Sequence, residues 1–417
     1  MDHVDRAALK DDMDKLRKEL ESSQGEEDLH HLNYIVSISN LFTVVGIATL
    51  WLPCHFIFPW VFLSTGTFAR WTMIAHHTCH GGYDHTSDSR YNRFKFGLGS
   101  FQRRFNDWLD WMLPEAWNVE HNNLHHYNLG EVTDPDLVEH NLKEVRESQS
   151  PMFFKYLRVL GAAATWKWLY YAPNTFKFYY MNKIDRSELK RKDANEPFLL
   201  HEVIGDLLNG DVKPWMNGLF YVLTPYFTFT FVLLPLAWGF ISWTVTGNGY
   251  EALQNAFLNV VVAEVMTNLH SFLMIVTNHA GNDLYRFESS CTPRSGEFYL
   301  RQIISSVNFS AGSDIIDYPH GWLNYQIEHH LFPSLSMLSY RRAMPRVKEI
   351  CKVILILDIY CISLIFNAKM FLLNIHSKYY FCFRNTEFLT FKKMSSFDYG
   401  RLYKLWWDQQ ACSSIKK

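Results

Sequence analysis

The chain has 417 residues, with 40 Lys and Arg against 42 Asp and Glu, and 48% of its residues are hydrophobic. This composition excludes disordered, collagen-like and disulfide-scaffold chains, and the net charge of -2 gives no argument for a nucleic-acid partner. The seven Cys contain no C-x-x-C pair, which suits a reducing compartment and argues against a zinc ribbon. The 19 His are the unusual feature, because they are clustered.

The first segment, residues 1–32, is charged and predominantly acidic. It is too acidic for a typical transit peptide, and it lacks the pattern of a signal peptide. Apolar side chains recur in it at helical spacing, which predicts a solvated amphipathic helix in a cytosolic N-terminal tail. These side chains are Leu9, Met13, Leu16 and Leu20.

Four apolar stretches have the length of membrane-spanning helices. They lie in two regions without Lys or Arg, one between Lys18 and Arg70 and one between Lys213 and Arg286. Each is long enough to cross a hydrocarbon core of roughly 30 Å at about 1.5 Å per residue. The alternative is two buried hairpins in a soluble core, but adjacent pairs of this length favour the membrane. The expected spans are residues 34–52, 53–69, 218–243 and 252–276.

The positions of the basic residues predict the topology. The link inside each pair of spans is short and carries no Lys or Arg, so all 40 basic residues fall on one side of the membrane. By the positive-inside rule that side is the cytosol, and both termini face it. In the cytosolic segment between the hairpins, the aromatic run of residues 153–181 is either a core helix or a helix in the headgroup plane. Its interspersed Lys residues favour the headgroup plane.

Three short histidine clusters stand out, at residues 76–80, 121–126 and 326–330. Each places ring nitrogens or an amide oxygen at positions i and i+4, which share one face of a helix. The predicted topology puts all three on the cytosolic side. One such pattern alone is more often a feature of a polar core, whereas three on one membrane face predict a metal site. The clusters read H-H-T-C-H, H-N-N-L-H-H and Q-I-E-H-H.

The type of ligand indicates the metal. Imidazole suits zinc, copper, iron and nickel, whereas oxygen-rich shells suit magnesium, calcium and manganese. Eight imidazoles and a glutamine are too many for one tetrahedral zinc. The zincin motif H-E-x-x-H is absent, because His201-Glu202 has no second His at the right place. Two metals with four or five protein ligands each are expected, and a redox-active di-iron centre fits best.

In this combination the chain resembles a membrane fatty acid desaturase. The boxes of that superfamily, H-x(3,4)-H, H-x(2,3)-H-H and [H/Q]-x(2,3)-H-H, match the three clusters in order and spacing. A third box that begins with Gln, here Gln326, is seen in the front-end group of acyl-lipid and Δ5/Δ6 enzymes. The likeness covers about residues 35–352. We therefore expect a desaturase domain at 33–352 and an atypical apolar and basic C-terminal extension at 353–417.

The resemblance implies an all-α integral membrane fold, a four-helix transmembrane bundle of two hairpins with a helical cytosolic cap that holds two Fe ions. The family has a further ligand at or beyond the end of the fourth span. His279 is the choice for it, and His270 is the rival, which lies deeper in the bilayer with Glu264 as its expected polar companion. The other implied ligands are His76, His80, His121, His125, His126, Gln326, His329 and His330, and the histidines among these eight are the implied catalytic residues.

One departure from the family pattern leaves an alternative open. The first box usually has Asp after its first His, and this chain has His77 there. His77 is therefore an alternative to His76, at i+3 spacing to His80. Acidic residues beside the boxes are candidates to orient a ligating ring by accepting its second N–H, or else are solvated loop carboxylates. These are Glu120, Glu131, Asp134, Asp136, Asp314, Asp317 and Glu328.

The implied reaction is O2-dependent desaturation of a fatty acyl chain, carried by a lipid or by CoA, with O2 reduced to water. The sequence shows no H-P-G-G motif of a fused cytochrome b5 domain, so electrons are expected from a separate cytochrome b5 or ferredoxin. A fatty-acyl or sphingolipid hydroxylase on the same di-iron scaffold is the first alternative. A non-catalytic His-rich metal transporter is the second, although its ligands are expected near the bilayer midplane. The expected location is the endoplasmic reticulum membrane, with a plastid membrane as the alternative.

An apolar tunnel is expected to hold the acyl chain beside the irons. Aromatic residues near the boxes are candidates for its wall or for the core around it. These are Trp108, Trp111, Trp117, Phe309, Tyr318 and Trp322.

Overall fold

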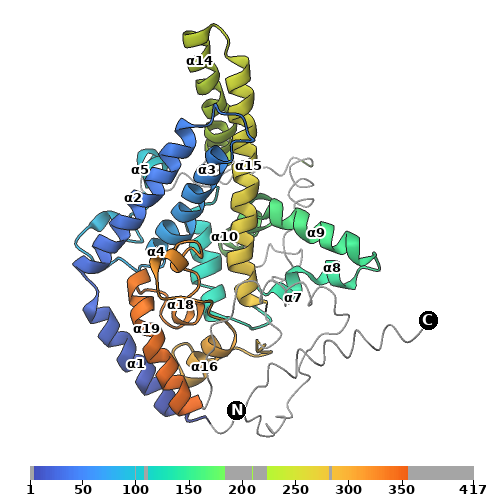
Figure 1. Cartoon of the computed structure of the whole chain (residues 1–417). Coiled ribbons are helices and arrows are strands. Elements are labelled where there is room, and N and C mark those ends of the chain that lie inside the picture. Colours follow the sequence, from blue (N-terminus) through green and yellow to red (C-terminus); the bar gives the residue numbers. More distant parts are fainter. Residues whose placement is uncertain are drawn as a thin grey trace, which may run out of the picture. The chain divides into compact units, whose positions relative to one another are not determined.

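Long apolar helices organise the chain in the computed structural model (Figure 1), which describes residues 4–98, 100–107, 111–183, 209, 223–280 and 284–355. Within these residues the regular structure is helical, apart from an isolated bridge between Glu131 and Phe287. The predicted all-α class is confirmed. The expected C-terminal extension lies outside the described residues beyond residue 355.

Among the residues that the structure describes, three helices have the length and apolar composition to cross a membrane. The first is Glu26–Ala48 (α2). The second, Thr224–Thr246, comprises α13 (Thr224–Phe227), η7 (Thr228–Leu233) and α14 (Leu234–Thr246), and the third, Tyr250–His279, comprises α15 (Tyr250–Ile275) and η8 (Val276–His279). They fall on three of the four predicted spans. The remaining prediction, residues 53–69, falls on α3 (Phe58–Ala69), which has 12 residues and continues directly into η1 (Arg70–Ala75) and α4 (His76–Cys79).

Sequence features at the helix ends explain where these helices start and stop. Glu26, Glu27 and Asp28 place negative charge on the first turn of α2, which favours the positive end of the helix dipole. The Asp28 carboxylate also accepts a hydrogen bond of 3.0 Å from the Gly25 amide. At the other hairpin, α14 (Leu234–Thr246) ends at Gly247, whose φ of 77° is the left-handed conformation that glycine adopts at helix ends.

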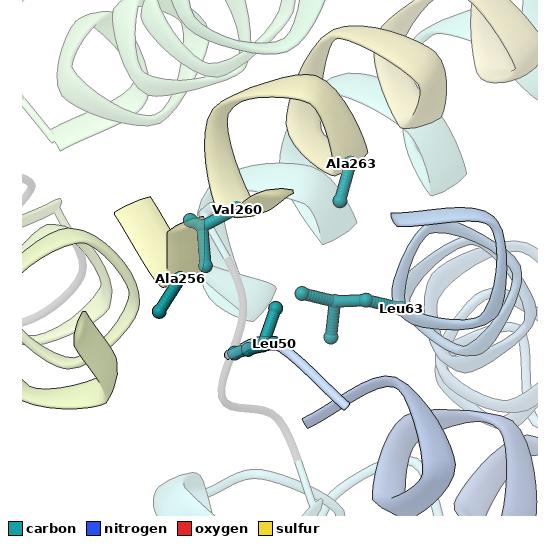
Figure 2. Close-up of a cluster of buried hydrophobic side chains, with 5 residues drawn as sticks. All are labelled: Leu50, Leu63, Ala256, Val260 and Ala263. Atoms are coloured by element: carbon teal, nitrogen blue, oxygen red, sulfur yellow. The ribbon is translucent and has the colours of Figure 1, made fainter. Parts of the chain in front are cut away.

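α3 packs along both α2 and α15, so the first hairpin lies against the last spanning helix (Figure 1). Gly66 of α3 allows the close approach to α2, because a Cβ there would collide with Thr43. Small and branched apolar side chains from the turn after α2, from α3 and from α15 cluster together, as Figure 2 shows; they are Leu50, Leu63, Ala256, Val260 and Ala263.

The N-terminal segment forms the expected amphipathic helix, α1 (Arg6–Ser23), but its apolar face is not solvated. Its four apolar side chains are buried, and the helix packs on α16 (Gly296–Ile304) and α19 (Met337–Ile350). An ion pair of 2.7 Å between Arg6 and Glu297 adds to this contact. The expectation of a solvated helix was therefore wrong for the apolar face, which supports the region around the third histidine cluster.

Shorter elements form the part of the fold that carries the clusters. Four of them are π-helical turns, whose extra residue per turn shifts the direction of later side chains and which often occur at functional sites. These turns are η1, η3 (Asn118–Asn122), η5 (Lys167–Tyr171) and η9 (Cys351–Leu355). The remaining elements are η2 (Ser89–Tyr91), α5 (Phe101–Asp107), α6 (Pro114–Trp117), η4 (His125–Tyr127), α7 (Val138–Asn141), α8 (Lys143–Glu147), α9 (Met152–Ala164), α10 (Ala172–Lys183), α17 (Asp314–Asp317) and α18 (Gln326–Leu331).

Candidate metal centre

Eight histidines from separate parts of the chain meet at one place in the interior. The helical turn α4 and its end supply the first two, η3 and η4 supply three more, η8 supplies one, and α18 supplies the last two. Each side chain is buried, although imidazole is a polar group that usually remains partly exposed. The residues are His76, His80, His121, His125, His126, His279, His329 and His330.

Their ring nitrogens form two groups. In the first group, one ring nitrogen from each of four histidines lies within 4.8 Å of the others; these are His76, His80, His121 and His329. The second group, within the same limit, consists of His125, His279 and His330. The His126 ring lies between the groups, with its centroid 4.5 Å from the rings of both His80 and His330. The arrangement offers positions for two metal ions.

The donor set fits metal ions because many of its buried atoms have no other partner. Buried polar atoms are nearly always hydrogen-bonded in proteins. Burial and the neighbouring imidazoles lower the pKa of His121, His126, His329 and His330 well below the usual value. These rings are therefore neutral at physiological pH, which is the form that binds metal. The atoms without a hydrogen-bond partner are His76 Nδ1, His121 Nδ1, His125 Nε2, both ring nitrogens of His126, His279 Nδ1, Gln326 Oε1 and both ring nitrogens of His330.

An aspartate orients one of these rings. His125 Nδ1 lies 2.7 Å from Asp134 Oδ1, so the ring donates its Nδ1–H and leaves Nε2 for the second group. The other oxygen of Asp134 accepts from the Gly130 amide at 3.0 Å, which holds the carboxylate in place. Asp136 Oδ2 lies 3.8 Å from Nδ1 of His121 and 4.0 Å from Nδ1 of His125. Both aspartates are among the predicted orienting residues.

The other acidic candidates have different surroundings. Glu131 pairs with Arg301 at 3.1 Å. Asp314 and Asp317 both pair with Arg341, and Glu328 accepts from Asn308 at 2.8 Å. Glu120 is buried near Asp136, and burial together with that charge raises the pKa of Glu120 well above its usual range.

The structure separates the alternatives left open by the sequence. His76 belongs to the first group, whereas the His77 ring lies outside both groups, 5.6 Å from the Tyr340 ring. His279 belongs to the second group. His270 lies outside both groups among the described residues, and its Nε2 donates to the Pro319 carbonyl at 2.7 Å.

The predicted companion of His270 was wrong. Glu264 forms an ion pair of 2.7 Å with Lys167, which lies 97 residues earlier in the chain.

A cavity adjoins the two histidine groups. Its polar side is made by Gln326 and by members of both histidine groups. The rest of its lining, the apolar side, comes mostly from apolar residues of η1, of the end of η5, of α15 and of the loop before α18. The residues of that side are Trp71, Thr72, Tyr171, Ile275 and Leu323.

None of the residues on the apolar side was singled out from the sequence. Two of them could have been predicted from their spacing to a histidine. Thr72 lies four residues before His76 and Ile275 lies four residues before His279, and residues at this spacing share one face of a helix. Of the aromatic candidates, Trp117 stacks on the His121 ring at 4.7 Å, and Trp108 is outside the described residues.

Comparison with known proteins gives the chain a family. Residues 49–356 match the family model for fatty acid desaturases. The chain is 22% identical over 313 residues to the sn-1 linoleoyl-lipid 6-desaturase of Arthrospira platensis, an alignment that covers 75% of this chain and 74% of that protein. No solved structure matches significantly.

Shorter matches point the same way. Delta(8)-fatty-acid desaturase 2 of Arabidopsis thaliana is 31% identical over 99 residues, which are 24% of this chain and 21% of the relative. Delta(6)-fatty-acid desaturase fat-3 of Caenorhabditis elegans is 38% identical over 79 residues, 19% and 17% of the two chains. These matches span about a fifth of the relatives. Together with the match of the family model over most of the sequence, they show that the chain belongs to the membrane fatty acid desaturases, a family of oxidoreductases.

Proposed function

We propose that this protein is a di-iron desaturase of the front-end type, which removes two hydrogens from adjacent methylenes of a fatty acyl chain while O2 is reduced to water. The observation that carries the proposal is the cavity, which is lined by members of both groups of buried histidines and by apolar residues. Several ring nitrogens of these groups have no hydrogen-bond partner. Electrons come from a separate donor, a cytochrome b5 or a ferredoxin.

The two histidine groups are the proposed ligands of the two irons. The first group would hold one iron and the second group the other; the His126 ring lies between the groups, and Gln326 lines the cavity. Imidazole-rich donors suit iron, and bound iron supplies the oxidation by O2 that no side chain can perform. The protein contributes neutral rings in fixed orientations, as the contact of His125 with Asp134 illustrates.

The apolar side of the cavity is the proposed place of the acyl chain. Trp71, Ile275 and Leu323 offer methylene groups an apolar surface and exclude water from the histidines. The relative that aligns over most of its length is named for a lipid-linked substrate. That likeness supports an acyl-lipid substrate over acyl-CoA.

The proposed topology has four spans with both termini in the cytosol. α3, η1 and α4 form one uninterrupted helical segment, Phe58–Cys79, which at about 1.5 Å per residue is long enough to span a bilayer. It lies against two helices that are themselves candidate spans, α2 and α15. We place the protein in the endoplasmic reticulum membrane, with a plastid membrane as the alternative.

α9 is proposed to lie in the headgroup plane of the cytosolic leaflet. The helix packs on α15 through one face, where Val159 and Ala163 are buried, and it exposes large apolar side chains on the other. Such a face suits the boundary between headgroups and acyl chains. The exposed side chains are Phe153, Phe154, Leu157 and Leu160.

Expression in a host without polyunsaturated lipids tests the proposed function. The wild type is expected to produce lipids with a new double bond, and His125→Ala is expected to abolish them. His85→Ala, at an exposed histidine, is the matched control and should leave the product unchanged. Hydroxylated lipids would instead identify a hydroxylase, and unchanged lipids with zinc in the purified protein would favour the metal transporter.

A further inference from the structure

A buried ion pair lies outside the histidine groups and the cavity. Lys167, at the start of η5, is fully buried, and its Nζ lies 2.7 Å from Oε2 of Glu264 in α15. The Tyr226 hydroxyl of α13 donates to the other oxygen of Glu264. An ionisable residue within a membrane-spanning helix is costly and commonly has a functional reason. None of these three side chains takes part in the proposed iron ligation.

A second contact fixes the backbone of Lys167 to the same helix. Its amide donates to Oδ1 of Asn268 at 2.9 Å, and Nδ2 of Asn268 donates to the Glu264 carbonyl at 2.9 Å. Glu264 and Asn268 are one turn apart on α15 and so present the same face. α15 therefore holds the beginning of η5 by both side chain and backbone.

The π-turn η5 connects the attached residue, Lys167, to the cavity. It runs from Lys167 to Tyr171, and Tyr171 lines the cavity. The rings of Trp166 and Tyr171, on either side of the turn, are stacked with centroids 4.7 Å apart. Both meet Trp71, another cavity residue, edge to face at 6.0 and 5.9 Å. Trp166, the residue before Lys167, therefore belongs to a cluster of packed aromatic rings, which we call the aromatic wall, that includes the cavity residues Trp71 and Tyr171.

Trp111 connects the ion pair to this wall a second time. The Lys167 ammonium lies 5.4 Å from the centroid of the Trp111 ring, within the range of a cation–π contact. The Trp111 ring in turn lies 5.3 Å from that of Trp71 and 5.8 Å from that of Tyr171. A shift of Lys167 would therefore be transmitted to both aromatic residues that line the cavity.

We propose that Lys167 and Glu264 are positioning residues that hold the aromatic wall of Trp71 and Tyr171 and thereby determine which carbon–carbon bond of the acyl chain lies beside the metal ligands. This inference rests on the proposed desaturase function. Apolar contact with an acyl chain is non-directional, so the chain's depth in the cavity depends on the shape of the wall. A misplacement of about 1 Å can change a rate by roughly a hundredfold.

The stability of the fold alone does not explain why an ion pair lies at this place. Buried ion pairs can often be replaced by apolar residues of similar volume without loss of stability, and their best-attested role is to fix one packing arrangement. Loss of the pair should therefore change the selectivity of the reaction more than the amount of folded protein.

The double variant Lys167→Met, Glu264→Gln tests the proposal in the intact protein. It removes both charges together, Met keeps the apolar stem, and the Gln oxygen can still accept from Tyr226. We expect metal content per purified protein to stay within twofold of wild type, while the ratio of the main double-bond position to neighbouring positions falls severalfold. Gas chromatography with mass spectrometry of derivatised lipids measures that ratio.

Two further variants make the outcome decisive. Asn268→Ala removes the contact with the Lys167 amide and the hydrogen bond to the Glu264 carbonyl, but it leaves the ion pair in place. It should shift the product ratio in the same direction, also if the double variant fails to fold. The control, Arg301→Met with Glu131→Gln, removes another buried ion pair that does not line the cavity, together with the ion pair of 3.0 Å between Arg301 and Glu297. It should leave the ratio of positions unchanged.

The results separate the two proposals. A wild type that makes no double bonds overturns the proposed function and this inference together. An active wild type whose ratio of positions is unaltered in the double variant and in Asn268→Ala overturns the inference alone.

Discussion

His125 Nδ1 and Asp134 Oδ1 are 2.7 Å apart, and both side chains are buried. The Asp134 carboxylate is itself fixed, because the backbone amides of Gly130 and Asp136 donate to it at 3.0 and 2.9 Å. The ring of His125 therefore has one favoured tautomer and one orientation before any metal binds. Because Asp134 orients His125 in this way, replacing Asp134 tests whether the second histidine group binds a metal ion.

Replacing Asp134 by Asn should impair the metal site more than the fold. The neutral amide is a weaker acceptor for the Nδ1–H of His125, and loss of such a partner typically costs about 10- to 100-fold in metal affinity or activity. We expect a loss of this size in iron affinity, measured by competition with a chelator, and in desaturated lipid. Asp314→Asn is the control, because Asp314 pairs with Arg341 away from the rings. Equal iron affinity in the two variants would contradict the assigned role.

His279 and His270 should behave differently when replaced. His279 belongs to the second group, whereas the His270 ring stacks on Phe68 at 3.8 Å and bonds the Pro319 carbonyl. His279→Ala is expected to reduce iron from about two ions per chain to about one and to abolish product. His270→Ala should retain both ions. Iron quantified by mass spectrometry on purified protein checks this, and iron loss confined to His270→Ala would reverse the assignment.

The histidine site was accessible from the sequence because its information is local. The first and third clusters each lie on one short helical turn, where positions i and i+4 share a face, whereas His121 and His125 lie on two different turns, η3 and η4. His279 was predicted because the resemblance to the desaturases implied a further ligand at the end of the fourth predicted span. The apolar side of the cavity was less accessible. Tyr171 reaches it through a π-turn, whose phase does not follow the 3.6-residue period used to read helices.

In the fold, too, features within one helix could be predicted, whereas contacts between distant segments could not. The amphipathic pattern of α1 predicted the helix and its apolar face, but a pattern within one helix does not tell which surface covers it. Here α16 and α19, which come much later in the chain, cover that face. Glu264 likewise meets Lys167, which only the tertiary packing of η5 on α15 brings near.

The buried face of α1 should contribute measurably to stability. Leu16 is 1% exposed against the later helices, and truncating such a side chain costs about 2–5 kcal/mol because a cavity remains. Leu16→Ala should therefore lower the unfolding temperature of the purified protein in detergent. Lys18→Ala, at an exposed position of the same helix, should change the free energy of unfolding by less than about 0.5 kcal/mol. Indistinguishable melting curves for the two variants would show that α1 does not depend on this contact.

Removing the metal ions should destabilise the protein, and returning iron should restore it. The eight histidines are gathered only in the folded chain, so ions that bind them favour folding by about 4 kcal/mol at a thousandfold excess over the dissociation constant. Without ions, the buried ring nitrogens of His126 and His330 have no partner, a further cost to the folded state. We expect chelation to lower the unfolding temperature of the wild type, and iron to raise it again. The double variant with His125→Ala and His329→Ala lacks one proposed ligand from each group, so iron should have little effect on its unfolding temperature. An equal rise of the unfolding temperature in the wild type and in the double variant would show that the ions bind elsewhere.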